Sequence, residues 1–205
     1  MKVCIVGAGA IGGWIGAPLA AAGVEVSAMA RGETLAALNT HGWRLQTADG
    51  LVQGPVAGAS ALASDLGVQD LVIIAVKGQA LASVAQGLAP LLGPQTLVLP
   101  AMNGVPWWFC KSLPELEQPL DSVDPGGLIE RLIPFEKVLG CVVHASTTVA
   151  EPGLVRHKGG NGLIVGEPGG GRSDRAHRVV DLLARGGFDV TCSDNVRQAI
   201  WYKLW

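Results

Sequence analysis

Charge is scarce in this sequence. Only 16% of the 205 residues are charged, and 17 acidic residues against 15 basic ones leave a net charge of -2 at pH 7. So weak a net charge provides no electrostatic footprint for a nucleic acid or an acidic membrane surface. We therefore expect a protein that handles small molecules, with neither a nucleic acid nor a membrane as its partner.

Cysteines are few and far apart. Cys4, Cys110, Cys141 and Cys192 form no CxxC pair, so their spacing indicates neither a zinc site nor a small disulfide framework. Free thiols at scattered positions are typical of proteins from a reducing compartment. The sequence therefore predicts no metal centre and a cytoplasmic location.

A genuine membrane-type apolar run is also missing, although one stretch imitates it. Residues 3–24 carry no charge and follow Lys2, as in a signal peptide or a membrane span. Six glycines and Pro18 lie within this stretch, and both residue types are unfavourable in such a helix. We interpret these glycines instead as positions where a helix approaches a sheet closely.

The residues that are abundant indicate an α/β fold. Apolar residues make up 49% of the chain, and its 29 glycines exceed the usual share of about 7%. Short apolar runs predict strands buried on both faces at residues 2–7, 24–30, 70–76 and 96–101. Stretches of helical composition separate them at residues 10–22, 33–40 and 79–92. This alternation predicts right-handed βαβ units and a Rossmann-like, doubly wound, mostly parallel sheet.

The remaining segments are less regular. Residues 43–47 and 51–56 predict a hairpin or two short strands around Asp49-Gly50. Residues 112–134 form a Pro-, Asp- and Gly-rich excursion with one helix near residues 128–132. Further strands are expected at residues 138–149, 153–157 and 162–166, antiparallel and at the sheet edge. A helix, a strand and a terminal helix then follow, at residues 174–185, 188–192 and 194–205.

A dinucleotide fingerprint lies directly after the first predicted strand. Residues 7–12 read GAGAIG, which fits GxGxxG at the entrance of the first helix. Gly7 permits the tight turn, Gly9 lets the backbone approach a pyrophosphate, and Gly12 allows the helix to pack closely on the strand. The alternative is a glycine-rich turn that serves packing alone. The expected cofactor contacts are Gly7, Ala8, Gly9, Ala10, Ile11 and Gly12.

Arg31 follows the second predicted strand, where an NAD enzyme would place an acidic residue against the ribose hydroxyls. A guanidinium at this position favours the 2′-phosphate of NADP, although Glu33 nearby would weaken that preference. The alternative is an ordinary solvated arginine at a strand end. The sequence thus predicts NADP(H) as the cofactor.

Lys77 and Asn103 follow two further predicted strands. Ligands of open α/β sheets bind beyond the carboxyl ends of the strands, so polar residues there are candidates for binding. Lys77 could reach a phosphate, a ribose or an anionic substrate, and Asn103 could hydrogen-bond the cofactor. The alternatives are a lysine that merely flanks a helix and an Asn-Gly turn formed for its geometry.

The terminal helix places a lysine on an apolar face. Val196, Ala199, Ile200, Lys203 and Leu204 share one stripe, and Ser193 or Asp194 is the expected N-cap. An apolar surrounding disfavours the charged form of a lysine and so makes it a competent proton donor near neutrality. The alternative is that the stem of Lys203 carries the ammonium out to solvent.

Taken together, these motifs resemble those of ketopantoate reductases. The shared features besides GAGAIG are Arg31-Gly32, Val76-Lys77, Asn103-Gly104, His144-Ala145 and the closing Trp201-Tyr202-Lys203-Leu204. The resemblance covers nearly the whole chain. The ordered set that ends in a Trp-x-Lys-Leu helix is more specific than GxGxxG, which many dehydrogenases share.

This resemblance implies NADPH-dependent reduction of 2-dehydropantoate, or of a related 2-oxo acid, to the 2-hydroxy acid in pantothenate and coenzyme A biosynthesis. It implies that Lys203 is the general acid and a substrate contact, and that Asn103 contacts both substrate and cofactor. It also places Ala145 at the cofactor, together with Arg31, Lys77 and residues 7–12.

Family members continue into an all-helical second domain. We therefore expect residues 1–193 to be the NADP-binding domain and residues 194–205 to be the first helix of a truncated second domain. Without the second wall of the cleft, this chain is expected to hold the dinucleotide but to be inactive alone. A homodimer is expected for the full-length form.

Two other functions remain open at the level of the sequence. One is a non-catalytic NADP-binding module that senses or sequesters the cofactor, and the other is a different NADP-linked hydroxyacid dehydrogenase of the same superfamily. The Trp107-Trp108-Phe109 cluster and the long excursion at residues 112–134 also leave the identity of the 2-oxo acid open.

Overall fold

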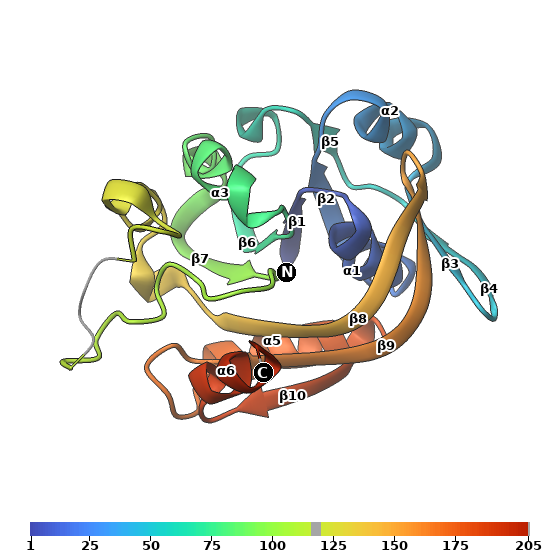
Figure 1. Cartoon of the computed structure of the whole chain (residues 1–205). Coiled ribbons are helices and arrows are strands. Elements are labelled where there is room, and N and C mark those ends of the chain that lie inside the picture. The colour runs from blue at the N-terminus through green and yellow to red at the C-terminus, as the bar shows by residue number, and fades with distance from the viewer. Residues whose placement is uncertain (116–119, 205) are drawn as a thin grey trace.

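The computed structural model describes residues 1–115 and 120–204, and its elements form two sheets with helices between and around them (Figure 1). The first sheet has five parallel strands in the order β5-β2-β1-β6-β7. These strands are β1 (Lys2–Val6), β2 (Glu25–Met29), β5 (Ala59–Ser60), β6 (Gln69–Ile74) and β7 (Leu92–Pro100). The predicted doubly wound parallel sheet is thus confirmed, and β5 is a strand that the sequence analysis did not predict.

Alternating side chains explain why the strands of this sheet are continuously apolar. Val3 and Ile5 of β1 point into one hydrophobic core, whereas Cys4 and Val6 point into another. The same alternation occurs along β6 and β7. Because helices cover both faces, most residues of these strands are buried, and the exposed ones, such as Lys2 and Asp70, lie near the strand starts.

The helices divide between the two cores. They are α1 (Ala10–Ala21), α2 (Gly32–His41), α3 (Gly78–Ala85), α4 (Leu128–Leu132), α5 (Asp174–Arg185) and α6 (Val196–Leu204). Buried residues of α1, α2 and α5 belong to the first core, and those of α3, α4 and α6 belong to the second. Within residues 1–115 and 120–204, none of the helices has both the length and the apolar character of a membrane span.

The second sheet corrects one expectation. Strands β10, β9, β3 and β4 follow one another in it, and β8 pairs with β9 in antiparallel orientation. Their bounds are β3 (Trp43–Thr47), β4 (Gly50–Gly54), β8 (Gly140–Glu151), β9 (Leu154–Gly166) and β10 (Asp189–Ser193). We expected the later strands at the edge of the first sheet. This was wrong, because β8 and β9 pair within the second sheet, and the chain just before β8 bonds to that edge, where Leu139 N–H donates to Val98 O at 2.9 Å.

Helix α1 lies between the two sheets, which explains its unusual composition (Figure 1). It packs on β1 and β2 on one side and on β3, β4, β8 and β9 on the other. A helix covered on both sides is apolar all round rather than amphipathic. Glycines allow the close approach: a Cβ on Gly13 would lie 2.5 Å from Val155 Cγ2, and one on Gly16 would lie 2.7 Å from the Trp43 ring.

We expect Gly16→Ala to destabilise the fold. The new methyl group would overlap Trp43, which is fully buried and donates its Nε1 hydrogen bond to Val26 O. Overpacking costs about 1–3 kcal/mol and outweighs the helix-propensity gain of at most about 1 kcal/mol. Urea unfolding should give a lower midpoint for this variant. The control is Gly87→Ala, whose Cβ has only ordinary contacts, the nearest at 3.6 Å, and equal midpoints for the two variants would contradict the packing argument.

Helix α3 and strand β9 are among the elements whose bounds differ from the prediction. Helix α3 ends at Ala85 instead of continuing to residue 92, because Gly87 and Pro90 end it and a 3-10 turn at Ala89–Leu91 leads into β7. Strand β9 is one long strand where two were expected. Its glycines do not interrupt it, because the pairing with β8 shifts register near them. Gly160 has φ +74°, and the side where a side chain would stand faces His144 O.

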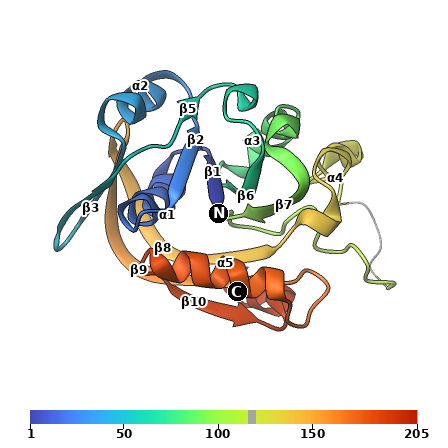
Figure 2. The ribbon, with the colours of Figure 1, turned by 180° about the vertical axis from the view of Figure 1, so that it is seen from behind.

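The excursion after β7 is ordered where it is described. Asp124 is buried, and its two carboxylate oxygens accept hydrogen bonds from Ile129 N–H at 2.7 Å and Glu130 N–H at 3.0 Å. These bonds hold the start of α4, which confirms the helix expected there (Figure 2). Residues 116–119 of the excursion and Trp205 of the predicted terminal helix lie outside the described residues.

Helix α6 begins at Val196, later than either predicted N-cap, Ser193 or Asp194, would place it. The Asn195 side chain accepts a hydrogen bond from Gln198 N–H at 3.1 Å, so Asn195 is the N-cap. The expected caps Ser193 and Asp194 were therefore wrong. Ser193 instead accepts a hydrogen bond from Asn195 N–H at 3.1 Å, which shapes the turn before the helix.

Candidate active site

The turn between β1 and α1 has the geometry that the glycine fingerprint predicts. Gly7 has φ +94°, a conformation that L side chains rarely adopt, and a Cβ on it would lie 2.6 Å from Val76 Cγ1. A Cβ on Gly12 would lie 2.1 Å from Gly7 O. Both positions therefore require glycine for the fold itself.

Gly9 differs from these two glycines because nothing lies within 4 Å of the Cβ it lacks. It precedes α1 without any capping side chain, so the N–H groups of Ala10, Ile11 and Gly12 at the first helical turn lack intrahelical partners. Ala8 is buried and Ile11 packs against the first core, so the open space is confined to the backbone at Gly9. A phosphate could approach these N–H groups without meeting a side chain.

Arg31 lies at the same edge of the sheet. Gly7 N–H donates to Met29 O at 3.0 Å, and Arg31 follows two residues later as the exposed N-cap of α2. Its guanidinium has no hydrogen-bond or ion-pair partner within residues 1–115 and 120–204. It is therefore available to an anionic group held near the glycine turn.

Lys77 flanks the glycine turn on its other side. It is the exposed N-cap of α3, directly after Val76, whose side chain contacts the backbone of Gly7. Strands β1, β2 and β6 are neighbours in the sheet, so Arg31, the glycine turn and Lys77 are aligned along one carboxyl edge. The structure thus brings together three of the groups that the sequence analysis proposed.

Lys203 and Asn103 form a second group, in direct contact. The Lys203 ammonium donates hydrogen bonds to Asn103 Oδ1 and to the backbone carbonyl of Val143. Asn103 follows β7, whereas Lys203 is in the last turn of α6, so residues 100 apart in the sequence meet here. An ammonium has three N–H donors, and the described residues accept from two of them. The third can therefore serve a ligand.

The apolar stripe of α6 is confirmed in part. Val196 and Ile200 are buried, and Ala199 packs against the second core. Leu204, which was placed on the same stripe, is instead 47% exposed. The Lys203 side chain is exposed, and its ammonium donates a hydrogen bond to the Val143 carbonyl.

Burial sets the protonation behaviour of this group. Desolvation lowers the pKa of Lys203 from its ordinary value. Cys141, which lies on the same strand as Val143, is buried, and its burial raises its thiol pKa to about 12. Its thiol therefore stays neutral near pH 7 and does not act as a counter-ion to Lys203.

Hollows on either side of Lys203 leave room for a ligand. One has a volume of about 210 Å³ and is lined by Met102, Asn103, Cys141 and Ile200 among others. The other, of about 290 Å³, is lined by residues that include His144 and Asp194. His144 belongs to the predicted His144-Ala145 pair, and Ala145 itself packs against the first core, on a strand that contacts α1.

Two features of this site had no counterpart in the sequence analysis. The Val143 carbonyl belongs to the backbone, so no residue type in the sequence indicates this acceptor. Trp107 and Trp108 are buried beside the site, although the sequence analysis noted them only as an aromatic cluster. The described residues contain no group of three or more His, Cys, Asp or Glu side chains placed to hold a metal ion.

Comparison with known proteins identifies the family of this chain. Residues 3–170 match the model of the family described as ketopantoate reductase PanE/ApbA. The chain belongs to this ketopantoate reductase family. The match contains the glycine turn, Arg31, Lys77, Asn103 and Ala145, whereas Lys203 lies after its last matched residue.

Relatives in the family share the whole length of this chain. A 2-dehydropantoate 2-reductase from Mesorhizobium japonicum is 41% identical over 208 residues, which cover 100% of this chain and 64% of the relative. A structure from Ralstonia solanacearum, assigned as a candidate ketopantoate reductase, is 50% identical with a TM-score of 0.95 and is covered to 64%. The chain thus spans a little under two thirds of these relatives.

A structure named as a different enzyme has a similar fold. A ternary structure of D-mandelate dehydrogenase is 24% identical, with a TM-score of 0.80 over 99% of this chain and 60% of that one. This likeness concerns the fold alone.

Proposed function

We propose that this chain binds NADPH and that its full gene product reduces a 2-oxo acid to the 2-hydroxy acid, with 2-dehydropantoate as the substrate. The observation that carries the proposal is the contact between Lys203 and Asn103 at the sheet edge that also holds the glycine turn. A proton donor and a dinucleotide site on one edge are the two components that carbonyl reduction needs.

The chain fits this cofactor at specific atoms. The open backbone at Gly9 and the unpaired N–H groups of the first turn of α1 would hold the pyrophosphate, and Arg31 would hold the 2′-phosphate. Lys77 and Ala145 complete the proposed contacts. When bound, the nicotinamide supplies the hydride that C2 of the substrate accepts.

Lys203 would supply the proton. Its two hydrogen bonds, to Asn103 and to the Val143 carbonyl, fix the direction of the ammonium, and the third N–H is free to meet the carbonyl oxygen of the substrate. As negative charge develops on that oxygen, Lys203 stabilises it and then transfers a proton to it, which yields the hydroxyl group. Asn103 holds Lys203 and would also contact the substrate.

Arg31→Ala tests the cofactor assignment. Because a hydrogen bond to a charged group contributes about 1.5–3 kcal/mol, we expect NADPH affinity to fall by about 10- to 100-fold and NADH affinity to change little. Fluorescence titration of both dinucleotides measures this, with Arg172→Ala as the control at another exposed arginine. Equal losses for the two dinucleotides would contradict a role for Arg31 at the 2′-phosphate.

Three further expectations belong to this proposal and stay predictions. They are the division of the chain at residues 193 and 194, the cytoplasmic location, and the homodimer of the full gene product. Light scattering on that product tests the homodimer.

A further inference from the structure

A large cavity, of about 490 Å³, lies beside the proposed catalytic lysine. Residues from α3, from the loop after β7, from the excursion and from α6 all contribute to its wall. Its apolar lining includes Leu81, Met102, Trp107, Trp108, Ile129 and Ile200. A volume of this size is typical of small-molecule sites.

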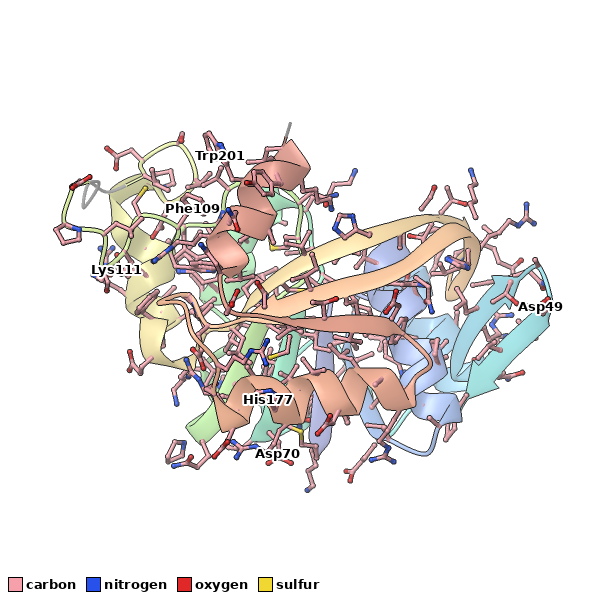
Figure 3. The ribbon with its side chains drawn as sticks, turned by 90° about the horizontal axis from the view of Figure 1, so that it is seen from below. Asp49, Asp70, Phe109, Lys111, His177 and Trp201 are labelled. Carbon is pink, nitrogen blue, oxygen red and sulfur yellow. The ribbon has the colours of Figure 1, made fainter. Side chains whose placement is uncertain are left out.

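The cavity connects to the lysine through shared walls. Asn103, Cys141 and Ile200 line both this cavity and the hollow of about 210 Å³ that contains Lys203. Figure 3 shows that the loop after β7 reaches α6 here, since Phe109 and Trp201 lie side by side with ring centroids 6.4 Å apart. A ligand that bonds to Lys203 can therefore extend into the cavity.

The wall selects against charge. None of the described residues that line the cavity is Asp, Glu, Lys, Arg or His. Transfer of a carboxylate or an ammonium into such a surrounding is strongly unfavourable without a partner. The group that enters must be uncharged and mainly apolar.

We propose that this cavity is the subsite for the side chain of the 2-oxo acid. It takes an uncharged, mainly apolar side chain of several carbons. The inference rests on the function proposed above, because it assumes that Lys203 receives the 2-oxo acid. The side chain of 2-dehydropantoate, with two methyl groups and one hydroxyl, matches this description.

Chain length is the first test, carried out on the protein expressed from its full coding sequence. Because each buried methylene contributes about 0.8 kcal/mol, kcat/KM should rise about fourfold per methylene from pyruvate through 2-oxobutanoate and 2-oxopentanoate to 2-oxohexanoate. The dicarboxylate 2-oxoglutarate should be a poor substrate. A flat profile with bound NADPH would overturn the subsite, whereas absence of NADPH binding would overturn the proposed function and the subsite with it.

Filling the cavity gives the matched test. Ala82 on α3 lines the cavity, whereas its exposed neighbour Ser83 does not. Ala82→Leu should abolish the gain with chain length and leave pyruvate reduction and NADPH affinity unchanged, and Ser83→Leu should retain the gain. An equal loss for pyruvate and 2-oxohexanoate, or a parallel loss of NADPH affinity, would show that the cavity serves the nicotinamide or the fold instead.

Discussion

Lys203→Ala should lower kcat of the full gene product by about 10²- to 10⁴-fold while the affinity for NADPH stays nearly unchanged. Lys203 lines the hollow of about 210 Å³, and hydrogen bonds to Asn103 and to the Val143 carbonyl fix its ammonium there. Without it, the developing alkoxide loses both its stabilising charge and its proton source. Stopped-flow measurement of NADPH oxidation, together with a cofactor titration, separates the two effects.

The control for this variant is Lys158→Ala, which removes an exposed lysine from β9. Its turnover should equal that of the unchanged protein. If Lys203→Ala retains full turnover, Lys203 has no part in the mechanism. If it loses NADPH affinity and turnover in parallel, the lysine supports the cofactor site rather than the chemistry.

The same residue predicts a dependence on pH. A general acid works in its protonated form, and burial lowers the pKa of Lys203 below its ordinary value of 10.5. The rate of reduction should therefore be fully present at pH values below this lowered pKa and should fall as the pH rises through it. A pH profile of kcat/KM shows the decline, which the Lys203→Ala variant should lack.

The sequence predicted the first sheet well, because the physics that forms it is local. Apolar runs such as residues 70–76, bounded by turn residues, leave few alternatives to a buried parallel strand, and the glycine pattern at residues 7–12 locates the strand-to-helix turn. The sequence analysis assigned Asn103 and Lys203 to the same substrate but did not predict the hydrogen bond between them. The third member of this group, the Val143 carbonyl, had no sequence signal.

The second sheet could not be predicted in the same way. Apolar alternation shows that a strand is buried on one or both faces but not which sheet it joins. One signal did exist: α1 is apolar on all sides, with Gly13 and Gly16 where Val155 and Trp43 approach. Such a helix needs cover on both sides, and one sheet can provide it on only one.

Sequence patterns could not predict the cavity, because part of its wall is formed by an irregular segment. The excursion has no periodicity, and its path is fixed by single contacts such as the Asp124 carboxylate on the N-terminus of α4. Trp107 and Trp108 were visible as an aromatic pair, but only the folded chain shows that both are buried beside Lys203 with unpaired donors. Substrate selection is therefore the part of the site that needed the structure.

The dinucleotide site at the turn between β1 and α1 is the claim on which the functional account depends, and Gly9→Val tests it most directly. Gly9 has φ -82° and ψ -153°, an extended conformation with negative φ, and no atom lies within 4 Å of the added Cβ. The fold should therefore persist, as circular dichroism and thermal unfolding would show. The matched control is Gly169→Val, at a loop glycine that is equally open.

Calorimetric titration of NADPH into the 205-residue chain is the decisive measurement. The unchanged chain and Gly169→Val should bind NADPH saturably, whereas Gly9→Val should bind it at least about 100-fold more weakly, because the side chain keeps the pyrophosphate from two or more N–H donors. No binding by the unchanged chain, or equal binding by Gly9→Val, would contradict a dinucleotide site at this turn.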